Sequence, residues 1–387
     1  MHISKLNLAN FRNYTDLNLE LSPHPMIFQG DNAQGKSNLL EAIWVLSTTK
    51  SHRATNEREL INWSISNEAL PVARLFGAVQ RSKDSITLET SLKLDKASRP
   101  DSSDSVGVVQ KRIRVNGIVR RAMDVVGQAN AVMFSAHDLD LIAGPPSLRR
   151  RHLDLINSQI DPHYLHCLQQ YNKVLTQRNH LLSLIQQRQA QTIQLEFWDK
   201  ELAENGSYLI GQRNSLALVL NELSAAIHDR LSGGEERLQL IYLPNVGSDN
   251  TAASEIKSEF QSALQRAQPT EVSRGMTLTG PHRDELRFKV NDVDMGTYGS
   301  RGQQRTIALS LRLAEASHLR DQANDPPILL LDDILSELDQ PRRHYLLDTI
   351  MSSQQVLITA TDLDHFDPSF LAQAIQFRVR QGRVERA

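Results

Sequence analysis

An octapeptide near the start of the chain has the residue types and spacing of a phosphate-binding loop. Residues 30–37, GDNAQGKS, match the pattern G-x-x-x-x-G-K-[ST]. Its two glycines let backbone N–H groups curl around phosphate oxygens without a clash from Cβ. Lys36 would contact the β- and γ-phosphates of a nucleotide, and the Ser37 hydroxyl would help to hold Mg²⁺. We therefore predict a site for ATP and Mg²⁺, formed by Gly30, Asp31, Asn32, Ala33, Gln34, Gly35, Lys36, Ser37 and Asn38.

A pair of adjacent acids, Asp332 and Asp333, follows the aliphatic run Ile328–Leu331. The run is typical of a central strand buried on both faces, and ligands of open α/β sheets collect where such strands end. Asp332 is the natural partner of Mg²⁺, and Asp333 is placed to orient the attacking water as a general base. Many Asp pairs merely end a strand in a solvated turn, but the phosphate-binding loop favours catalysis here.

Two stretches could form the signature of ABC ATPases, which heads a helix leading directly into the strand with the acids. Residues 231–235, LSGGE, resemble the usual LSGGQ, but the residues after them alternate like a strand, so we interpret them as a Gly-rich turn. Residues 298–305, YGSRGQQR, precede a helix at the required place. Their Ser-x-x-Gln spacing also predicts a capping box, and a helix N-terminus bearing a serine is itself an anion site. The predicted signature, acting on the nucleotide of a second subunit, is Ser300, Arg301, Gly302 and Gln303.

The elements around these residues predict an α/β protein. Residues 1–12 indicate a pair of short strand pieces, and the apolar run 26–29 stops where an amphipathic helix at 36–47 is about to begin. Asn116-Gly117 predicts a hairpin turn. Near the end of the chain, strands at 328–331 and 355–359 flank a helix at 341–352, and this order suggests a parallel sheet.

The middle of the chain has a different character. From residue 147 to 231, Gly and Pro nearly vanish and apolar residues recur at helical spacing, without the unbroken heptads of a long coiled coil. Strand-like segments resume at 238–243 and 276–290, followed by a helix at 300–319. The Ser- and Asp-rich segment 97–106 predicts a mobile surface loop. We interpret the whole as one α/β head that is split by a helical insertion.

Composition limits the class of protein further. The 387 residues exceed one ordinary core, and the single cysteine, Cys167, fits a reducing compartment. Neither an apolar signal-peptide core nor a run of roughly 20 apolar residues is evident, so we expect a cytoplasmic protein with no membrane partner. With 43 basic and 45 acidic side chains, overall charge does not indicate nucleic-acid binding.

Taken in order along the chain, several motifs resemble the RecF family of bacterial recombination-repair ATPases. They are LANFRNY at 8–14, GDNAQGKSNLLEAI at 30–43, PPSLRRRHLD at 145–154, GPHRD at 280–284, SRGQQR at 300–305, and LDD at 331–333 with SELD at 336–339. The resemblance implies an ABC-type, SMC-like head with mixed sheets, formed by residues 1–146 and 270–387. Residues 147–269 would form a mainly helical arm. It also adds Arg12 and Asn13 to the ATP site.

The resemblance further implies what the protein does. It implies a homodimer that forms with ATP, weak, Mg-dependent ATP hydrolysis stimulated by DNA, and binding to double-stranded DNA and ss/ds junctions. Its partners would be RecR, with RecO, in loading RecA, and its roles would extend to replication restart and the SOS response. Two departures from related ATPases bear on the rate. Asp333 stands where transporter and SMC ATPases usually carry Glu, which predicts slow turnover. No switch histidine follows the last strand, where Thr359 and Thr361 are alternatives for contact with the γ-phosphate; Gln128 is a candidate for the Q-loop residue.

Several clusters of basic residues could contact DNA phosphates without reading the sequence. Each cluster alone is more often a solvated face or a set of ion-pair partners, and only the family resemblance favours DNA. The candidates are Lys50, Arg53, Lys111, Arg112, Arg149, Arg150 and Arg151.

Three other functions compete with this interpretation. A transporter ATPase would carry an aromatic A-loop, LSGGQ close to the acid strand and a switch histidine, which this chain does not match. Another SMC-class repair head would lack contacts with RecR and RecO. A nucleotide-sensing scaffold would need ATP binding but not hydrolysis, so substitutions of Lys36 and Asp333 would distinguish it.

Overall fold

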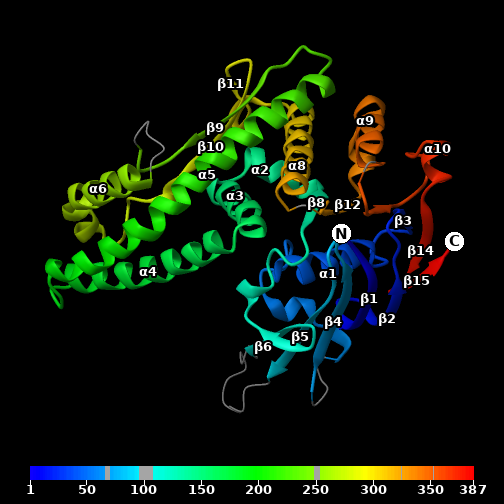
Figure 1. Cartoon of the computed structure of the whole chain (residues 1–387), viewed down its shortest axis with the longest axis horizontal. Helices are drawn as coiled ribbons and strands as arrows, with labels where there is room; N and C mark the ends of the chain where they lie inside the picture. Colours follow the sequence, from blue (N-terminus) through cyan, green and yellow to red (C-terminus); the bar gives the residue numbers. More distant parts are fainter. Residues whose placement is uncertain (66–69, 96–107, 248–252, 324, 352) are drawn as a thin grey trace. The chain divides into compact units, whose positions relative to one another are not determined.

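The computed structural model describes residues 1–65, 70–95, 108–247, 253–323, 325–351 and 353–387. The predicted loop at 97–106 lies outside these residues. The chain forms two compact units (Figure 1), the first made of Met1–Ala136 and Leu319–Ala387 and the second of His137–His318. This division reflects contacts within each unit, and the assignment of segments to a head and an arm remains a prediction.

A six-stranded, largely parallel sheet lies at the centre of the first unit. Its order is β15-β14-β3-β13-β12-β8, in which only β15 runs antiparallel. The strands are β3 (Pro25–Gln29), β8 (Ala131–Ser135), β12 (Ile328–Asp332), β13 (Val356–Ala360), β14 (Ile375–Arg380) and β15 (Arg383–Arg386). β8, β12 and β13 are buried nearly throughout, as expected for aliphatic strands with both faces covered. The predicted parallel pairing of the 328–331 and 355–359 strands is confirmed.

The described residues of this unit also form helices. They are α1 (Lys36–Thr48), α9 (Gln340–Met351) and the short α10 (Pro368–Leu371). The helices predicted at 36–47 and 341–352 are therefore confirmed within one residue at each end. α1 is buried along almost its whole length, because it packs between this sheet and a second one.

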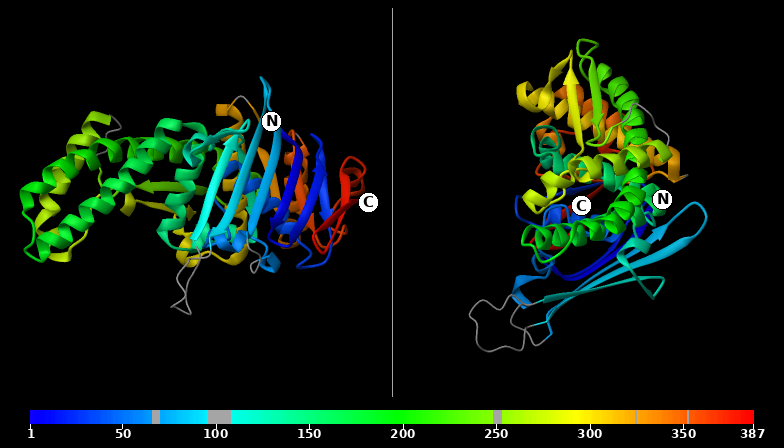
Figure 2. Two further views of the ribbon diagram at one scale, coloured as in Figure 1. Left: turned by 90° about the horizontal axis from the view of Figure 1, so that it is seen from below. Right: turned by 90° about the vertical axis from the view of Figure 1, so that its left-hand side faces the viewer.

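The second sheet of the first unit is antiparallel, and Figure 2 shows its strands side by side. Its order is β2-β1-β4-β5-β6-β7, from β1 (His2–Phe11), β2 (Tyr14–Glu20), β4 (Val72–Gln80), β5 (Ser85–Asp95), β6 (Val108–Val115) and β7 (Ile118–Arg120). The predicted hairpin turn is confirmed, since Asn116 and Gly117 both have positive φ, 51° and 76°. The pair of strand pieces predicted within residues 1–12 is wrong. A register shift between Ile3 and Lys5 disturbs the alternation, yet β1 continues through it.

The second unit is mainly helical. It contains α2 (Leu139–Ala143), α3 (Pro146–Ile160), α4 (Pro162–Gln186), α5 (Leu195–Leu231), α6 (Ala253–Arg274) and α7 (Met295–Tyr298). Its small sheet has the order β11-β10-β9, from β9 (Leu238–Leu243), β10 (Glu285–Val290) and β11 (Val293–Asp294). α4, α5 and α6 enclose a core that includes Tyr164, Tyr171, Leu202 and Phe260. The helices predicted between 147 and 231 are confirmed.

One sequence prediction for this part of the chain needs correction. The strand expected at 276–290 begins only at Glu285, because Gly280 (φ 133°) and a short 3-10 turn, Pro281–Arg283, occupy the segment before it. The predicted border between residues 269 and 270 falls inside α6, which contains Pro269. The helix predicted at 300–319 is confirmed as α8 (Arg301–Ala323), whose residues from Leu319 onward belong to the first unit. No helix within the described ranges is long and apolar enough to span a bilayer.

Candidate nucleotide-binding site

The loop between β3 and α1 requires glycine at two positions, Gly30 and Gly35. A Cβ on Gly30 would lie 2.3 Å from the Val379 carbonyl oxygen, and one on Gly35 would lie 2.6 Å from the Asn13 side chain. Gly35 also has φ +115°, in the region that favours glycine. α1 begins directly after this loop with neither a side-chain cap nor an acidic residue in its first turn. Its first N–H groups and positive dipole end are therefore suited to an anion.

A set of side chains holds the loop from behind. Asn13 donates from Nδ2 to the Gln34 carbonyl oxygen (2.9 Å) and accepts at Oδ1 from Asn38 (2.8 Å). Arg12 forms a bidentate pair with the fully buried Glu41 (2.9 and 2.8 Å). Burial alone would raise the pKa of Glu41, but hydrogen bonds from Arg12 and Ser51 outweigh it and lower that pKa. In this structure Arg12, Asn13 and Asn38, predicted to contact ATP, thus shape the loop.

Lys36 lies across the loop, where its ammonium donates to the carbonyl oxygens of Gly30 and, at 3.1 Å, of Asp31. Burial lowers the pKa of Lys36, while the nearby carboxylates of Asp333, Asp332 and Asp31 act in the opposite direction. An ammonium that is only tied to carbonyl oxygens can turn to a phosphate oxygen, which is a stronger acceptor. The loop residues Asp31, Asn32 and Ala33 are exposed, and Ala33 has φ 64°.

The Ser37 hydroxyl donates to Oδ1 of Asp332 at 2.7 Å. This contact joins the first turn of α1 to the end of β12, two segments that are far apart in the sequence. A serine hydroxyl and a carboxylate are hard oxygen donors, which suit Mg²⁺. The sequence prediction that these two residues share a metal site therefore fits the geometry.

Asp333 follows in an unusual backbone conformation, with φ 51°. Its N–H donates to Oγ1 of Thr359 (2.9 Å), and that hydroxyl donates to Oδ1 of Asp332 (2.9 Å). Burial raises the pKa of Asp333, while Lys36 acts to lower it. A carboxylate that binds a proton more readily is better suited to take one from water. The sequence did suggest Thr359 near the site, but its role in orienting both acids follows only from the register of β12 and β13.

Two further candidates have partners of their own. Thr361 donates to Asp362 (3.3 Å), and Gln128 accepts a hydrogen bond from Arg81 (3.0 Å).

The predicted signature lies in the second unit, at the start of α8. Ser300 and Gln303 form a reciprocal capping box: the Ser300 N–H donates to Oε1 of Gln303 (3.1 Å), and the Gln303 N–H donates to Oγ of Ser300 (3.2 Å). Arg301 and Gly302 are exposed. The competing LSGGE stretch is a turn, as predicted, with φ 68° at Gly233 and 81° at Gly234 before β9.

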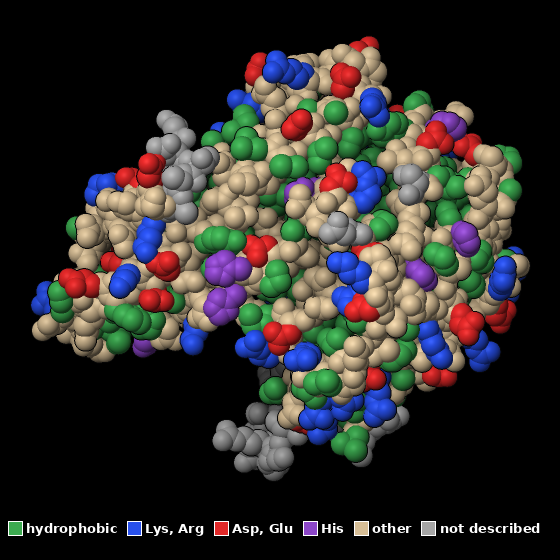
Figure 3. Space-filling view, in the orientation of Figure 1, with side chains coloured by type: hydrophobic (Ala, Val, Ile, Leu, Met, Phe, Trp, Pro, Cys, Tyr) green, Lys and Arg blue, Asp and Glu red, His purple; other side chains and the backbone are tan. Residues whose placement is uncertain are grey.

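The basic residues predicted to contact DNA differ in their surroundings. Lys50, Arg53 and Arg112 are exposed, and on the face drawn in Figure 3 basic side chains are interspersed with acids and gather over the antiparallel strands. Lys111 instead forms an ion pair with Glu57 (2.6 Å) and donates to a backbone carbonyl. Register explains the contrast, because Arg112 is opposite Ser91 on the outer face while Lys111 is opposite the buried Leu92.

The three arginines of PPSLRRRHLD also differ from one another. Arg149 is buried and forms two hydrogen bonds with Glu285 (2.8 and 3.0 Å), and Arg150 donates to the Asp284 carbonyl oxygen (2.8 Å). Arg151 is exposed. In this structure Arg150 therefore links PPSLRRRHLD to GPHRD, and Arg149 links it to Glu285, the residue that follows GPHRD.

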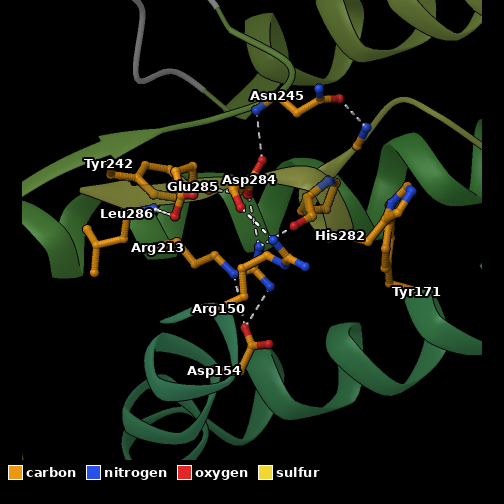
Figure 4. Close-up of polar contacts among 12 residues, drawn as sticks. Arg150, Asp154, Tyr171, Arg213, Tyr242, Asn245, His282, Asp284, Glu285 and Leu286 are labelled. Carbon is orange, nitrogen blue, oxygen red and sulfur yellow. Dashed lines mark hydrogen bonds and ion pairs between the residues drawn. The ribbon is translucent and has the colours of Figure 1, made fainter. Parts of the chain in front are cut away.

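Figure 4 shows how closely these two motifs meet. The fully enclosed Arg213 of α5 pairs with Asp154 (2.8 Å) and with Asp284 (2.9 Å). Asp284 also accepts from the Tyr242 hydroxyl and from the backbone N–H of Asn245. Burial raises the pKa of Asp284, but its ion pair and hydrogen bonds act in the opposite direction. The two motifs thus form a buried polar core that fixes α3, α5 and β10 to one another.

A phosphate-binding loop, an acid pair at the end of a central parallel strand, and a serine-headed helix before that strand define an ATPase head of the ABC and SMC class. Comparison with known proteins agrees: residues 2–383 match the family model described as RecF/RecN/SMC N terminal domain. The chain is 44% identical to the DNA replication and repair protein RecF of Herpetosiphon aurantiacus over 99% of both chains. It is 40% identical to that of Bacillus cytotoxicus, covering 100% of this chain and 98% of the relative.

Solved structures support the same assignment. A structure described as the recombination mediator protein RecF-ATP in the RecFOR pathway has a TM-score of 0.88 and 31% identity, covering 100% of this chain and 97% of that one. An Smc head bound to the C-winged helix domain of ScpA, with a TM-score of 0.55 and 15% identity, shares the fold. The chain belongs to the RecF family of DNA replication and repair proteins. The predicted family and fold class are therefore confirmed.

Proposed function

We propose that this protein is an ATP-dependent DNA-binding protein of recombinational repair that binds Mg-ATP, dimerises on it and hydrolyses it slowly. The observation that carries the proposal is the 2.7 Å contact between Ser37 and Asp332 at the mouth of a glycine-dependent loop. The RecF structure described with ATP, at 31% identity over the whole chain, supports ATP as the nucleotide.

The chemistry assigned to this chain is that of a P-loop ATPase. Lys36 would move from the loop carbonyls to the β- and γ-phosphates, and Ser37 and Asp332 would hold Mg²⁺. The chemistry that Mg²⁺ would supply there is neutralisation of phosphate charge. Asp333 would accept the proton of the attacking water. Its carboxylate lies one methylene closer to the backbone than that of Glu would, and about 1 Å of misplacement can cost on the order of 100-fold in rate.

The dimer would place each nucleotide between the P-loop of one copy and the signature of the other. Ser300 supports this role because its hydroxyl accepts from the Gln303 N–H and keeps its own proton for a phosphate oxygen. Arg301 and Gly302 are exposed at the same helix end, and their N–H groups would face the same anion.

The DNA partner would be a duplex at a gap or an ss/ds junction. Lys50, Arg53, Arg112 and Arg151 are exposed and would contact phosphates. Lys111, Arg149 and Arg150 would contact phosphates by exchanging the ion pairs and hydrogen bonds described above. The recombination-mediator name of the solved relative supports RecR and RecO as partners in loading RecA. With this role we propose a cytoplasmic location, residues 1–146 and 270–387 as the head, and residues 147–269 as the arm.

The test is the mass of the particle in solution, measured by sedimentation with and without Mg-ATP and a gapped duplex. The wild-type chain is expected to be a monomer without nucleotide and a dimer with it. Ser300→Arg would place a bulky cation at the signature and is expected to abolish the dimer. Ser232→Arg, in the LSGGE turn, is the matched control and is expected to dimerise normally. A wild-type chain that stays monomeric at saturating Mg-ATP would refute the proposal. If Ser232→Arg abolished the dimer and Ser300→Arg did not, the signature would be the LSGGE turn and not the start of α8.

A further inference from the structure

The side-chain amide of Gln303 has two partners on opposite sides. Its Oε1 accepts from the Ser300 N–H at 3.1 Å, and its Nε2 donates to Oε1 of Glu236 at 2.8 Å. Because a carboxylate only accepts and a backbone N–H only donates, a flipped amide would lose both contacts. Glu236 therefore selects the amide orientation that completes the capping box of the signature.

Glu236 has a second contact that leads away from the signature. Its Oε2 lies 2.9 Å from Nε2 of His228, a residue of α5 with no exposed surface. The other ring nitrogen of His228 lies 3.4 Å from the Ser310 hydroxyl, on the buried side of α8. One carboxylate thus joins the end of the long α5 helix to the first turn of the signature helix.

The backbone around Glu236 is held as firmly as its side chain. The Arg237 N–H donates to Oδ1 of Asn291 at 3.0 Å, and the Asn291 N–H donates back to the Arg237 carbonyl oxygen at 3.1 Å. On the other side, Gly233 and Gly234 end α5 with positive φ. The position of Glu236 is therefore set by α5 and by the β10–β11 hairpin, so a movement of α5 would reach Gln303 through it.

We propose that Glu236 and His228 are positioning residues for the signature. Through Gln303 they hold Ser300 in the orientation that binds the nucleotide of a second copy, and they make this orientation depend on the position of α5. Glu236 directly follows the LSGGE stretch at 231–235, so this signature-like stretch would influence the proposed signature at 300–303 through Glu236. This inference rests on the proposed ATP-dependent dimer. Without Glu236 the Gln303 amide can flip, the Ser300 N–H loses its acceptor, and the first turn of α8 is no longer fixed.

The first experiment compares Glu236→Ala with Glu235→Ala, which removes the exposed acid next to it. Glu236→Ala is expected to raise the ATP concentration for half-maximal dimerisation, and the KM for hydrolysis, by about tenfold or more, since hydrogen bonds to charged groups have about that effect. The kcat at saturating ATP should stay within about threefold. Nucleotide affinity of the monomer should not change, because Glu236 is absent from the P-loop. Equal behaviour of the two variants would overturn the inference.

The second experiment exchanges the two groups. Gln303→Glu alone places a second carboxylate against that of Glu236. It is expected to impair dimerisation more than Glu236→Ala does. The double variant Glu236→Gln with Gln303→Glu restores an amide–carboxylate pair in reverse, keeps an acceptor for the Ser300 N–H, and is expected to recover dimerisation to within about threefold of wild type. A double variant as impaired as Gln303→Glu would refute the pair even if Glu236→Ala proved unstable. If wild-type protein itself failed to dimerise, the proposed function would fall instead.

Discussion

The Thr359 hydroxyl lies 2.9 Å from Oδ1 of Asp332, and the two residues are opposite each other on the parallel strands β13 and β12. The same hydroxyl accepts from the N–H of Asp333 at 2.9 Å. One side chain thereby orients both acids of the site. Thr359 lies near the end of β13, just before the place where the sequence lacks the switch histidine of related ATPases, and in this chain its hydroxyl orients the two carboxylates.

Replacement of Thr359 by Val should show how much this hydroxyl contributes. Val has nearly the same shape but leaves the Asp333 N–H without its acceptor, which should cost about 1–3 kcal/mol of unfolding free energy. Loss of the carboxylate orientation should lower kcat by about tenfold or more. Urea unfolding and steady-state ATP hydrolysis measure the two effects. Thr361→Val is the control, since the Thr361 hydroxyl donates to Asp362 at 3.3 Å. Equal results for Thr359→Val and Thr361→Val would contradict the proposed role of Thr359.

Lys36→Met and Asp333→Asn should fail at different steps. Lys36→Met removes the cation of the loop, so nucleotide binding and dimerisation should both be lost. Asp333→Asn keeps the loop, and Asn tolerates the positive φ of 51° at this position, but the amide cannot accept the proton of water. We expect a dimer that persists with ATP while turnover falls about 100-fold or more. Fluorescent-nucleotide titration and sedimentation distinguish the two variants. If Asp333→Asn hydrolysed ATP at the wild-type rate, Asp333 would not be the general base.

Much of the site could be predicted because its chemistry depends on short-range patterns. The loop 30–37 and the acids at 332–333 each follow an apolar strand, so their position is set by local sequence. The long-range contacts could not be predicted in this way. No local pattern joins Glu236 to Gln303 or His228. Lys111 and Arg112 are neighbours in β6, and which of them faces outward is known only from the register of β6 with β5.

The same limit applies to the fold. The bulge near Ile3 interrupts the alternation of a strand that continues, so β1 looked like two pieces. The sequence does not predict α6 as a distinct helix, and Pro269 lies inside it, where proline disfavours a continuous helix. Long segments with steady periodicity, such as α4 and α5, were predicted because each carries its own amphipathic evidence.

His282 should make the second unit sensitive to acid. Its Nδ1 lies 2.6 Å from the Tyr171 hydroxyl and its Nε2 is 3.3 Å from the Thr277 carbonyl oxygen, which suits the neutral ring. Burial lowers the pKa of His282 to about 4 from 6.5, opposed by the hydrogen bond to Thr277 and aided by nearby arginines. As the pH falls, His282 therefore binds a proton in the unfolded chain at a higher pH than in the folded protein. The stability that neutral His282 contributes is complete above pH 6.5 and is lost as the pH falls toward about 4.

The loss from this one group should be on the order of 3 kcal/mol over that range. Urea unfolding at pH 7.5 and at pH 5 should detect about 2 kcal/mol of this loss, because pH 5 lies above the folded pKa. His282→Gln keeps a polar partner for Tyr171 and should weaken the pH dependence, whereas His166→Gln, at an exposed position of α4, should leave it as in wild type. A pH dependence that is the same in all three proteins would show that His282 is not the group responsible.

Substitution of an exposed basic residue should weaken DNA binding, whereas substitution of a buried one should mainly destabilise the fold. If Arg112 contacts a phosphate, Arg112→Ala should weaken binding to every sequence alike and reduce the slope of log affinity against log salt by about 1. Arg149→Ala should leave that slope unchanged and instead destabilise the fold by about 1–3 kcal/mol, because it removes both hydrogen bonds that the half-buried Glu285 carboxylate accepts from Arg149. Fluorescence anisotropy on a gapped duplex at several salt concentrations, together with thermal unfolding, measures both. A reduced slope for Arg149→Ala alone would place the nucleic acid on α3 and remove the antiparallel sheet from the interface.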